Sequence, residues 1–395
     1  MKILEINKFH FAKGGADKHF LDVISLLENQ GHEVAVFSMR HSKNSGVKQD
    51  NYFVSTVGYT QEYSLWEKLK GAFRMFHSFE AKKKINELLD DFQPDIAHIH
   101  NIYHQLSPAI LFEIKKRNIP IVMTVHDYKL INPNYNLYSN GKSYDRCRDK
   151  KYYQCFLDRC VKNSYLKSFL AMLEMYWHES LGTYGKNIDI YIAPSEFAKR
   201  TLVEWGMDHE KIIVLPHFIN KELAITAQAD GEKYALYYGR ISKEKGVADL
   251  MSIFENLNSK TKLYMAGEIE NNFKIRESEN IKYLGYLDKN ELMPYIKKTD
   301  FVVSASKLPE TFGLVALESI SQGKPFIGLR NGAYPEIIKN GINGFLVGSK
   351  NELRNVISKM IKNELVFNSQ KIQKLAYEKY NKADYYSKLI SIFQR

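Results

Sequence analysis

Apolar and polar positions alternate along this chain in short blocks, and their spacing switches between that of strands and that of helices. The first block, residues 2–6, has strand character, and Gly14 and Gly15 separate it from a helical pattern over residues 16–30. A glycine ends that pattern, and residues 33–37 form a second short strand. This βαβ opening predicts a parallel sheet with helices on both faces.

The same alternation continues through the first half of the chain and restarts near Glu232. In the first half the pattern predicts strands at 95–100, 120–125 and before Ala193, and helices at 79–91, 108–116 and after an N-cap at Ser195. In the second half it predicts strands at 234–238, 261–265, 281–283, 301–304 and 324–329, and helices at 247–257, 290–297 and 314–322. The fold class is therefore α/β, with two doubly wound, Rossmann-like halves.

We place an N-terminal domain at 1–218 and a C-terminal domain at 219–380, joined near residues 216–230. The C-terminal segment, 381–395, carries a short amphipathic helix without a partner strand, so we expect it to pack back on the first domain. Residues from about 127 to 180 break the rhythm, are rich in Tyr and Lys, and hold all three cysteines. Insertions of this size on an α/β scaffold are often functional.

Composition narrows the class of protein. A chain of 395 residues is too long for one compact core. Its fractions of charged residues, 26%, and of hydrophobic residues, 44%, are typical of a globular protein. No run of about 18 apolar residues predicts a membrane span, and Glu5 stands where a signal peptide needs apolar residues. Three cysteines cannot form a disulfide framework, so we expect ordinary thiols in a cytoplasmic protein. The net charge of +11 suggests an anionic partner: nucleic acid, a membrane face or a phosphorylated small molecule.

Ligands of doubly wound sheets bind beyond the carboxyl ends of the strands, so candidate residues belong to the strand-to-helix turns. Gly14 and Gly15 either approach a phosphate closely or form a tight turn with a positive φ. In residues 239–246, Arg240 and Lys245 either clamp a diphosphate or belong to a solvated basic loop.

A third turn contains Glu310 and leads to Glu318, which falls among apolar helical positions expected to be buried. A buried carboxylate needs hydrogen-bond donors, and ligand hydroxyls such as a ribose diol would supply them. Backbone N–H groups at residues 312–314 suit a phosphate. The alternative for Glu310 is that its charge complements a helix dipole.

A fourth turn places His126 at a strand end, where it can act as an acid, a base or a hydrogen-bond donor. His98 and His100 lie on a predicted strand without clear further ligands, so their spacing argues against zinc. No Asp-x-Asp occurs, so no motif supports a divalent cation at a nucleotide sugar.

These turns, in this order, resemble the GT-B fold glycosyltransferases of family 4 over most of the chain. The resemblance rests on the following stretches: Gly14-Gly15, Gly31-His32-Glu33-Val34, His126, Ala193-Pro194-Ser195-Glu196, Gly239-Arg240, Lys245-Gly246, Glu310-x₇-Glu318, Gly332 to Ile338 and Asn343 to Val347. It implies two domains facing each other across a cleft, and a retaining, metal-independent hexosyltransferase without a cofactor. It also implies that the donor is a nucleotide-diphosphate sugar, with UDP favoured over GDP.

The resemblance also implies residue roles. Arg240 and Lys245 would hold the diphosphate and stabilise its departure, and Glu318 would bind the ribose. Glu310, His126 and the Gly14-Gly15 turn would contact the donor sugar or its phosphates. Further substrate contacts are expected at Phe312, Gly313, Leu314, Gly285, Tyr286, Leu287, His100 and Asn101. Thr311 and Ala333 depart mildly from the family pattern, and Tyr144 stands where some relatives carry one cysteine of a four-cysteine cluster.

The acceptor is expected to be a glycan or a lipid-linked saccharide of cell-surface polysaccharide or lipopolysaccharide synthesis. Residues 161–177 combine apolar side chains with Lys162 and Lys167. They are expected to form either a helix packed in the core or a helix that rests on the anionic inner face of the plasma membrane. The alternative functions are a nucleotide-sugar epimerase or hydrolase on this fold, a basic nucleic-acid-binding protein and an inactive binding module. Scattered basic residues argue against nucleic acid as a partner.

Overall fold

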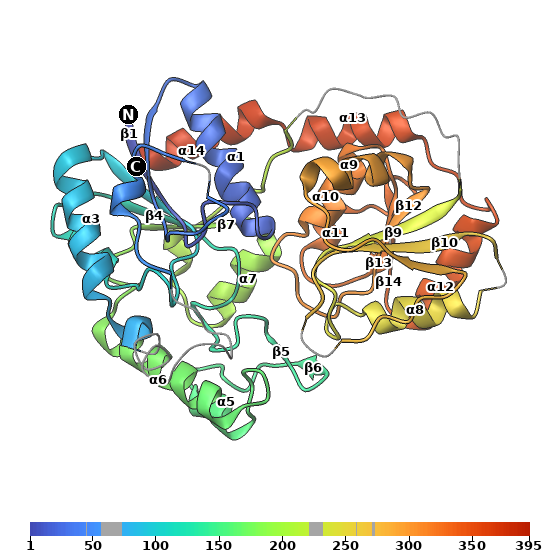
Figure 1. The fold of residues 1–395 in the computed structure, drawn as a ribbon, viewed down its shortest axis with the longest axis horizontal. Helices are drawn as coiled ribbons and strands as arrows, with labels where there is room; N and C mark the ends of the chain where they lie inside the picture. Colours follow the sequence, from blue (N-terminus) through green and yellow to red (C-terminus); the bar gives the residue numbers. More distant parts are fainter. Residues whose placement is uncertain (45, 57–72, 221–231, 258, 271–272) are drawn as a thin grey trace. The chain divides into compact units, whose positions relative to one another are not determined.

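The computed structural model describes residues 1–395 except 45, 57–72, 221–231, 258 and 271–272 (Figure 1). Contacts divide the chain into two compact units. The first unit contains residues 1–140, 144–216 and 383–395, and the second contains 141–143 and 217–382. Of the predicted linker at 216–230, residues 221–230 lie outside the described part.

The first unit is built on a six-stranded parallel sheet in the order β2-β1-β3-β4-β7-β8. The strands are β1 (Lys2–Ile6), β2 (Glu33–Phe37), β3 (Ile96–Ile99), β4 (Ile121–Thr124), β7 (Ile190–Ala193) and β8 (Ile212–Val214). The helices are α1 (Gly15–Asn29), η1 (Asp50–Tyr52), α3 (Phe79–Phe92), α4 (Ile110–Lys115), α5 (Tyr153–Leu157), α6 (Tyr165–Leu181), α7 (Glu196–Glu204) and η2 (His209–Lys211). A small hairpin, β5 (Tyr138–Ser139) and β6 (Lys142–Ser143), stands apart from the sheet.

The second unit repeats this plan with the strand order β11-β10-β9-β12-β13-β14, again parallel. Its strands are β9 (Tyr234–Tyr238), β10 (Lys262–Ala266), β11 (Ile281–Tyr283), β12 (Phe301–Ser304), β13 (Phe326–Leu329) and β14 (Gly344–Val347). Its helices are α8 (Val247–Glu255), α9 (Lys289–Lys298), α10 (Leu314–Ser321), α11 (Tyr334–Ile337), α12 (Lys350–Ile361) and α13 (Ser369–Lys379). The predicted class of two doubly wound halves is confirmed.

Strands buried on both faces explain why the predicted β segments read as continuous apolar runs. In β9, Leu236 belongs to one hydrophobic cluster of the second unit, and Ala235 and Tyr237 belong to the cluster on the opposite face. Side-chain alternation along a strand sends successive residues to opposite faces, so helices must cover both. Ser195 caps α7 as predicted, since its side chain accepts a hydrogen bond from the Ala198 N–H.

The last helix, α14 (Lys382–Phe393), belongs mostly to the first unit, where it lies among the blue elements in Figure 1. Two of its tyrosine hydroxyls lie within hydrogen-bond distance of histidine ring nitrogens of that unit. Tyr385 Oη is 3.1 Å from His19 Nε2, and Tyr386 Oη is 2.8 Å from His32 Nε2. These contacts and the buried Leu389 attach the end of the chain to the first sheet.

Candidate active site

The second unit has the strand order 3-2-1-4-5-6 of a dinucleotide-binding sheet, counted along this unit. From β9 the chain continues to β10 on one side, whereas β12 pairs with β9 on its other side and leads on to β13. The loops that follow β9 and β12 therefore run in opposite directions and diverge between these two strands. Such a switch point is where open α/β sheets bind ligands. Arg240 and Lys245 follow β9, and Glu310 follows β12, so the predicted loops meet there.

Lys245 and Glu310 form the central ion pair of this site, with Nζ 2.6 Å from Oε1. Both side chains are about four-fifths buried. Gly246 makes this approach possible. Its φ is +71°, and a Cβ there would lie 2.0 Å from the carbonyl oxygen of Ala305. Only glycine therefore lets the first loop touch the end of β12 and carry Lys245 to its partner.

Glu310 is held from two further sides. Ser306 Oγ donates a hydrogen bond of 2.8 Å to Glu310 Oε1. Behind its backbone, Gly332 has a φ of +56°, and a Cβ there would lie 2.3 Å from the Glu310 nitrogen. The next residue, Ala333, donates its N–H to the Glu310 carbonyl at 2.9 Å. The Gly332-Ala333 turn thus fixes the peptide that presents the carboxylate, and the alanine at the second position fits because its φ is negative.

Arg240 is the second cation of the site and is more exposed, at 39%. Its guanidinium lies 3.6 Å from Glu244 and 4.0 Å from Glu270, both weak, solvent-screened contacts. Its backbone is fixed more firmly, because the Tyr237 hydroxyl donates to the Arg240 carbonyl at 2.6 Å. The guanidinium can therefore turn toward an anion without breaking a strong internal bond.

The N-terminus of α10 adds backbone donors to the same edge of the sheet. Gly313 is its N-cap with a φ of +101°, and no side chain caps the helix. The first N–H groups of such a helix suit an anionic ligand. Phe312 is buried against His217, with ring centroids 4.8 Å apart, and Leu314 is half-buried. Glu318 is half-buried rather than buried as predicted.

Glu318 nevertheless lies close to a buried hydroxyl. Burial and the carboxylate of Glu318 raise the pKa of Tyr238 well above its usual range. This keeps the Tyr238 hydroxyl protonated, and it donates to the Val315 carbonyl at 3.0 Å. Gly285, Tyr286 and Leu287 follow β11, and the Gly267 N–H donates to the Gly285 carbonyl at 2.8 Å. Tyr286 is 53% exposed.

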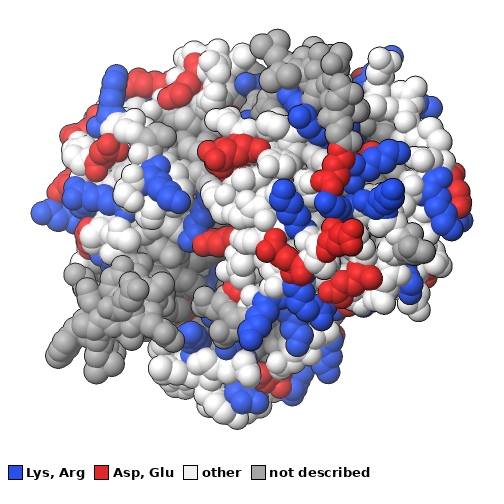
Figure 2. Space-filling model, turned by 45° about the vertical axis from the view of Figure 1, so that its right-hand side comes forward, with Lys and Arg blue, Asp and Glu red and all other residues white. Residues whose placement is uncertain are grey.

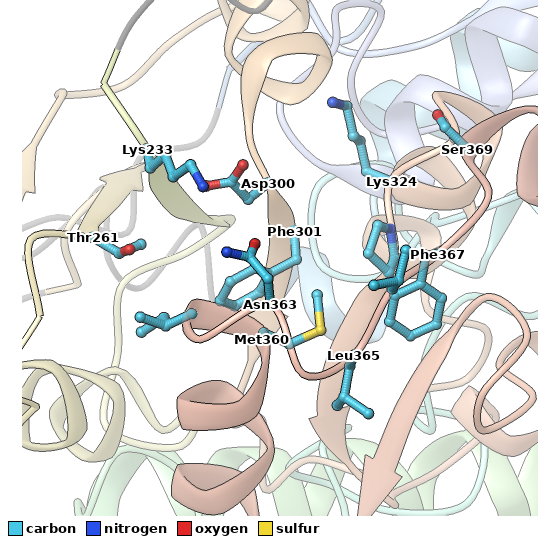
Figure 3. Close-up of a pocket in the computed structure, with 14 residues that line it drawn as sticks. Lys233, Thr261, Asp300, Phe301, Lys324, Met360, Asn363, Leu365, Phe367 and Ser369 are labelled. Carbon is cyan, nitrogen blue, oxygen red and sulfur yellow. The ribbon is translucent and has the colours of Figure 1, made fainter.

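A cavity of about 240 Å³ in the second unit lies at the amino ends of the strands, opposite the carboxyl ends that carry the candidate site (Figure 3). Lys233, Phe301 and Pro325 line it, and these residues begin or precede strands. In the close-up Lys233 and Asp300 point toward one another. Because ligands of doubly wound sheets bind at the carboxyl ends, this cavity is not the candidate active site.

One interpretation of the Gly14-Gly15 turn in the first unit was a tight turn with a positive φ. The structure does not have a positive φ at Gly14. Gly14 has an extended φ of −154°, and a Cβ there would meet only Asp17 Oδ2, at 3.8 Å. The fold of the first unit therefore does not demand glycine at this position. Asn7, at the end of β1, donates its amide to Asp17 Oδ1 at 2.9 Å and ties the turn to the sheet.

His126 follows β4 and begins a line of buried polar groups. Its Nε2 lies 2.8 Å from Nδ1 of His100, whose Nε2 lies 3.2 Å from Glu5 Oε2. The other carboxylate oxygen lies 2.9 Å from His98 Nδ1, and His98 Nε2 lies 2.8 Å from the Thr124 hydroxyl. His98, His100 and Glu5 are fully buried.

Sequence reasoning missed Glu5 as a partner of these histidines. In the parallel register Glu5 lies beside His98, so a carboxylate inside an apolar strand was the available signal. Glu5 also supplies a third donor where the sequence offered none for a metal. Each of the four ring nitrogens already has a hydrogen-bond partner, so the group is satisfied without an ion.

The structure changes two predicted substrate contacts. His100 has no exposed surface and both its nitrogens are engaged, so it can act on a substrate only through His126. Asn101 is 5% exposed and exchanges backbone bonds with the end of β1, accepting from Lys8 and donating to the Asn7 side chain. Within the described residues its Oδ1 has no partner.

The cysteines also differ from expectation. Cys155 and Cys160 form a disulfide, and Cys147 is a buried thiol. Together with Tyr144 all three lie in one small hydrophobic cluster of the insertion. The Cys147 thiol is 3.7 Å from the Tyr144 hydroxyl, and burial raises its pKa to about 11. Tyr144, the Cys147 thiol and the disulfide thus share the small core of the insertion.

Two family models together match residues 13–383. The model "Glycosyltransferase Family 4" covers residues 13–223, and the model "Glycosyl transferases group 1" covers residues 218–383. The first of these alone spans more than half of the chain. The chain belongs to glycosyltransferase family 4. A relative, an uncharacterized 42.6 kDa protein in the cps region of Klebsiella pneumoniae, is 26% identical over 85% of this chain and 87% of its own length.

Solved structures of GT-B glycosyltransferases share the fold of this family 4 chain. The apo form of the lipopolysaccharide outer core galactosyltransferase WaaB has a TM-score of 0.62 at 16% identity, over 100% of this chain and 99% of WaaB. HepE from Anabaena in complex with UDP and glucose has a TM-score of 0.67 at 14% identity, over 100% and 99%. At these identities the likeness establishes the architecture, and the chemistry rests on the residues above.

Proposed function

We propose that this glycosyltransferase moves a hexose from a UDP-sugar to a glycan or lipid-linked acceptor of cell-surface polysaccharide synthesis, with retention of configuration. The observation that carries the proposal is the Lys245–Glu310 pair, with Arg240 beside it, at the switch point of the second sheet. The complex of HepE with UDP and glucose supports the donor, and the cps-region relative and WaaB support the acceptor.

In this proposal the two cations receive the diphosphate and stabilise the negative charge that grows on it as the sugar leaves. Lys245 exchanges part of its contact with Glu310 for a phosphate oxygen, and Arg240 turns from its weak carboxylate contacts. Two fixed positive charges can balance the diphosphate, so the proposal needs no divalent ion. Glu310, freed from Lys245, accepts hydroxyls of the donor sugar, and Glu318 accepts those of the ribose.

Retention follows if the acceptor hydroxyl attacks the anomeric carbon from the side on which the diphosphate departs. The bond from the anomeric carbon to the phosphate oxygen breaks, a new bond to the acceptor oxygen forms, and the acceptor proton passes to the departing phosphate. This route requires no protein nucleophile. The cations hold the phosphate in place until it has taken the proton.

The test measures binding of UDP, GDP and ADP by calorimetry, with and without EDTA. UDP should bind the wild type, and Arg240→Ala and Lys245→Ala should each weaken binding roughly 10–100-fold, the value of a charge-assisted hydrogen bond. Lys243→Ala is the matched control, since this exposed lysine lies in the same loop. Equal losses for Lys243 and Lys245, or no nucleotide binding, contradict the proposed site. NMR of the product anomer then separates transfer with retention from inversion and from hydrolysis.

The second part of the proposal is that the first unit contacts an anionic membrane through α6. This helix is apolar on two sides. Ala171, Met175 and other inner residues are buried, whereas Leu166 and Trp177 are 68% and 47% exposed. The exposed apolar residues form one stripe along the helix: Leu166, Phe169, Leu173 and Trp177. A stripe of this kind marks an interaction surface.

The charge around this stripe favours an anionic surface. Residues 141–170 contain eight Lys or Arg and three Asp or Glu. Within the described residues no helix is long and apolar enough to cross a bilayer, so the proposed contact is peripheral. Elsewhere Lys and Arg are interspersed with Asp and Glu over the face in Figure 2, without the continuous basic stripe that nucleic acid requires.

Vesicle sedimentation tests this contact. Binding to vesicles with phosphatidylserine, and little to neutral vesicles, is expected, with a blue shift of Trp177 fluorescence. Leu166→Ser with Phe169→Ser should weaken binding by about 2 kcal/mol, roughly 30-fold, if each side chain is partly inserted. Leu375→Ser, an exposed leucine of the second unit, is the control. Equal binding to neutral vesicles, or no effect of the paired change, contradicts this part alone.

A further inference from the structure

The hydrogen bonds behind His126 form a line with a defined direction. Its Nε2 meets His100 Nδ1 at 2.8 Å, and the two ring planes are within 17° of each other, which suits an in-plane bond between them. His100 Nε2 continues the line to Glu5 Oε2 at 3.2 Å. The line therefore begins at a half-buried ring and ends at a fully buried carboxylate.

The carboxylate sets the direction. Burial would raise the pKa of Glu5, but the charge of His98 and hydrogen bonds from His100 and His98 outweigh it and hold this pKa below its usual range. An ionised carboxylate only accepts, so His100 must carry its proton on Nε2 and donate it to Glu5. Burial and the neighbouring His98 lower the pKa of His100 to about 4, so this ring is neutral.

A neutral ring with its proton on Nε2 has a lone pair on Nδ1 and can only accept there. The group that meets Nδ1 of His100 is Nε2 of His126, which must therefore donate. We propose that Glu5 and His100 are positioning residues that fix the tautomer of His126, with the proton on Nε2 and the lone pair on Nδ1. The inference rests on the proposed function for the group that His126 meets, and on the hydrogen-bond geometry and the charge of Glu5 for the tautomer.

This tautomer decides which ligand group His126 recognises. Nδ1 accepts a hydrogen bond from a hydroxyl, whereas a diphosphate oxygen at neutral pH has no proton to donate. With this tautomer His126 suits a substrate hydroxyl rather than a phosphate. The buried carboxylate gives the first unit selectivity for a neutral, hydroxyl-bearing group.

The test is nitrogen NMR of imidazole-labelled protein at pH 8, above the ordinary histidine pKa. The His126 resonances are identified by their loss in His126→Gln. In the wild type we expect a protonated Nε2 and an unprotonated Nδ1. A proton on Nδ1 overturns the proposal. The tautomer is read from the spectrum of the unaltered chain, so this result does not depend on whether Glu5→Gln folds.

Glu5→Gln then tests the cause. The amide can donate to His100, which reverses the line and moves protons toward Nδ1 of His126, so a changed or mixed tautomer is expected. Thr124→Val is the matched control: Thr124 is also buried, and its hydroxyl lies 2.8 Å from His98 Nε2, off the line. It should leave the His126 tautomer unchanged. An unchanged tautomer in Glu5→Gln, or the same change in both variants, overturns the positioning role.

Kinetics separate this inference from the proposed function. Glu5→Gln should lower kcat/KM roughly 10–100-fold, the range for partners that orient a functional histidine. Its affinity for UDP should stay unchanged, because the cations of the second unit bind that part. A wild type that does not bind UDP refutes the proposed function and leaves the tautomer result standing. Loss of UDP affinity in Glu5→Gln contradicts the assigned role.

Discussion

The buried pair of Lys129 and Glu174 is the contact by which α6 is anchored to the loop after β4. Lys129 Nζ lies 2.7 Å from Glu174 Oε2, and His104 Nε2 lies 3.2 Å from the same oxygen. The two side chains of the pair are 4% and 1% exposed. Burial would raise the pKa of Glu174, but Lys129 and His104 lower it to about 2. We predict that Glu174→Gln destabilises the first unit strongly.

The magnitude follows from this pKa. A shift from an ordinary value of about 4.5 to about 2 corresponds to roughly 3–4 kcal/mol of stability, or roughly a 300-fold change in the folding equilibrium. Because the folded pKa is lowered, the contribution is complete above about pH 5 and is lost as the pH falls toward 2. The same order of magnitude, about 3–5 kcal/mol, is typical when one partner of a buried pair is removed, because the other charge, here that of Lys129, stays buried. The expected loss at pH 7 is therefore about 3–4 kcal/mol.

Urea unfolding followed by tryptophan fluorescence measures this change in the first unit alone. The three tryptophans are at 66, 177 and 205, and the ranges of the second unit contain none. Glu87→Gln is the control, because Glu87 also contacts a lysine of the first unit, Lys83, but the two side chains are 49% and 79% exposed. It should cost about 1 kcal/mol or less. Glu174→Gln with Lys129→Met should recover most of the loss.

Two results would refute this reasoning. One is a loss below about 1 kcal/mol for Glu174→Gln, which would mean that solvent screens the pair. The other is an unchanged dependence of stability on pH between 5 and 3, which would mean that Glu174 is not the group that titrates there. Either result would also remove the anchor that presents the exposed stripe of α6 to a membrane.

Two further changes have distinct expected outcomes. Gly332→Ala forces a Cβ against the Glu310 backbone, so UDP binding by calorimetry should weaken about tenfold and stability should fall by roughly 1–3 kcal/mol. Gly341→Ala, also at positive φ but with nothing within 4 Å, should cost stability without weakening UDP binding. Reducing the disulfide of Cys155 and Cys160, or replacing both by Ser, should cost the first unit about 2 kcal/mol, measured by fluorescence in urea. An unaltered midpoint after reduction would contradict this.

Most strands and helices could be predicted because each is a local pattern. The strand at Lys2–Ile6 and the one at Tyr234–Tyr238 have their predicted bounds, since buried parallel strands leave a continuous apolar run between turns. The turn residues Arg240 and Lys245 could be predicted for the same reason: the loop follows directly from the strand end. The pairing of Lys245 with Glu310 needed only the rule that carboxyl ends of neighbouring strands share an edge.

Pairings between distant segments had no comparable signal. Glu5 and His98 are 93 positions apart and meet only because β3 pairs with β1, which periodicity cannot reveal. Lys129 and Glu174 lie in or beside the insertion, where no regular alternation predicts which side of α6 is inward. Glu318 was expected to be buried from its apolar neighbours, yet its position on α10 leaves it half-buried. In each case the missing information is tertiary.

The two sheets differ in where their polar groups lie at the switch point, on the strands in one and on the loops in the other. We expect this difference to decide what each sheet can bind. At the first switch point, between β1 and β3, Glu5 and His98 lie on the strands and His100 follows β3 directly, so all three are fully buried. At the second, between β9 and β12, the charged groups lie on loops, where solvent compensates for their charge until an anion replaces it. A charged diphosphate therefore suits the second unit, and its binding should weaken with salt. A hydroxyl bound at His126 should not show that dependence.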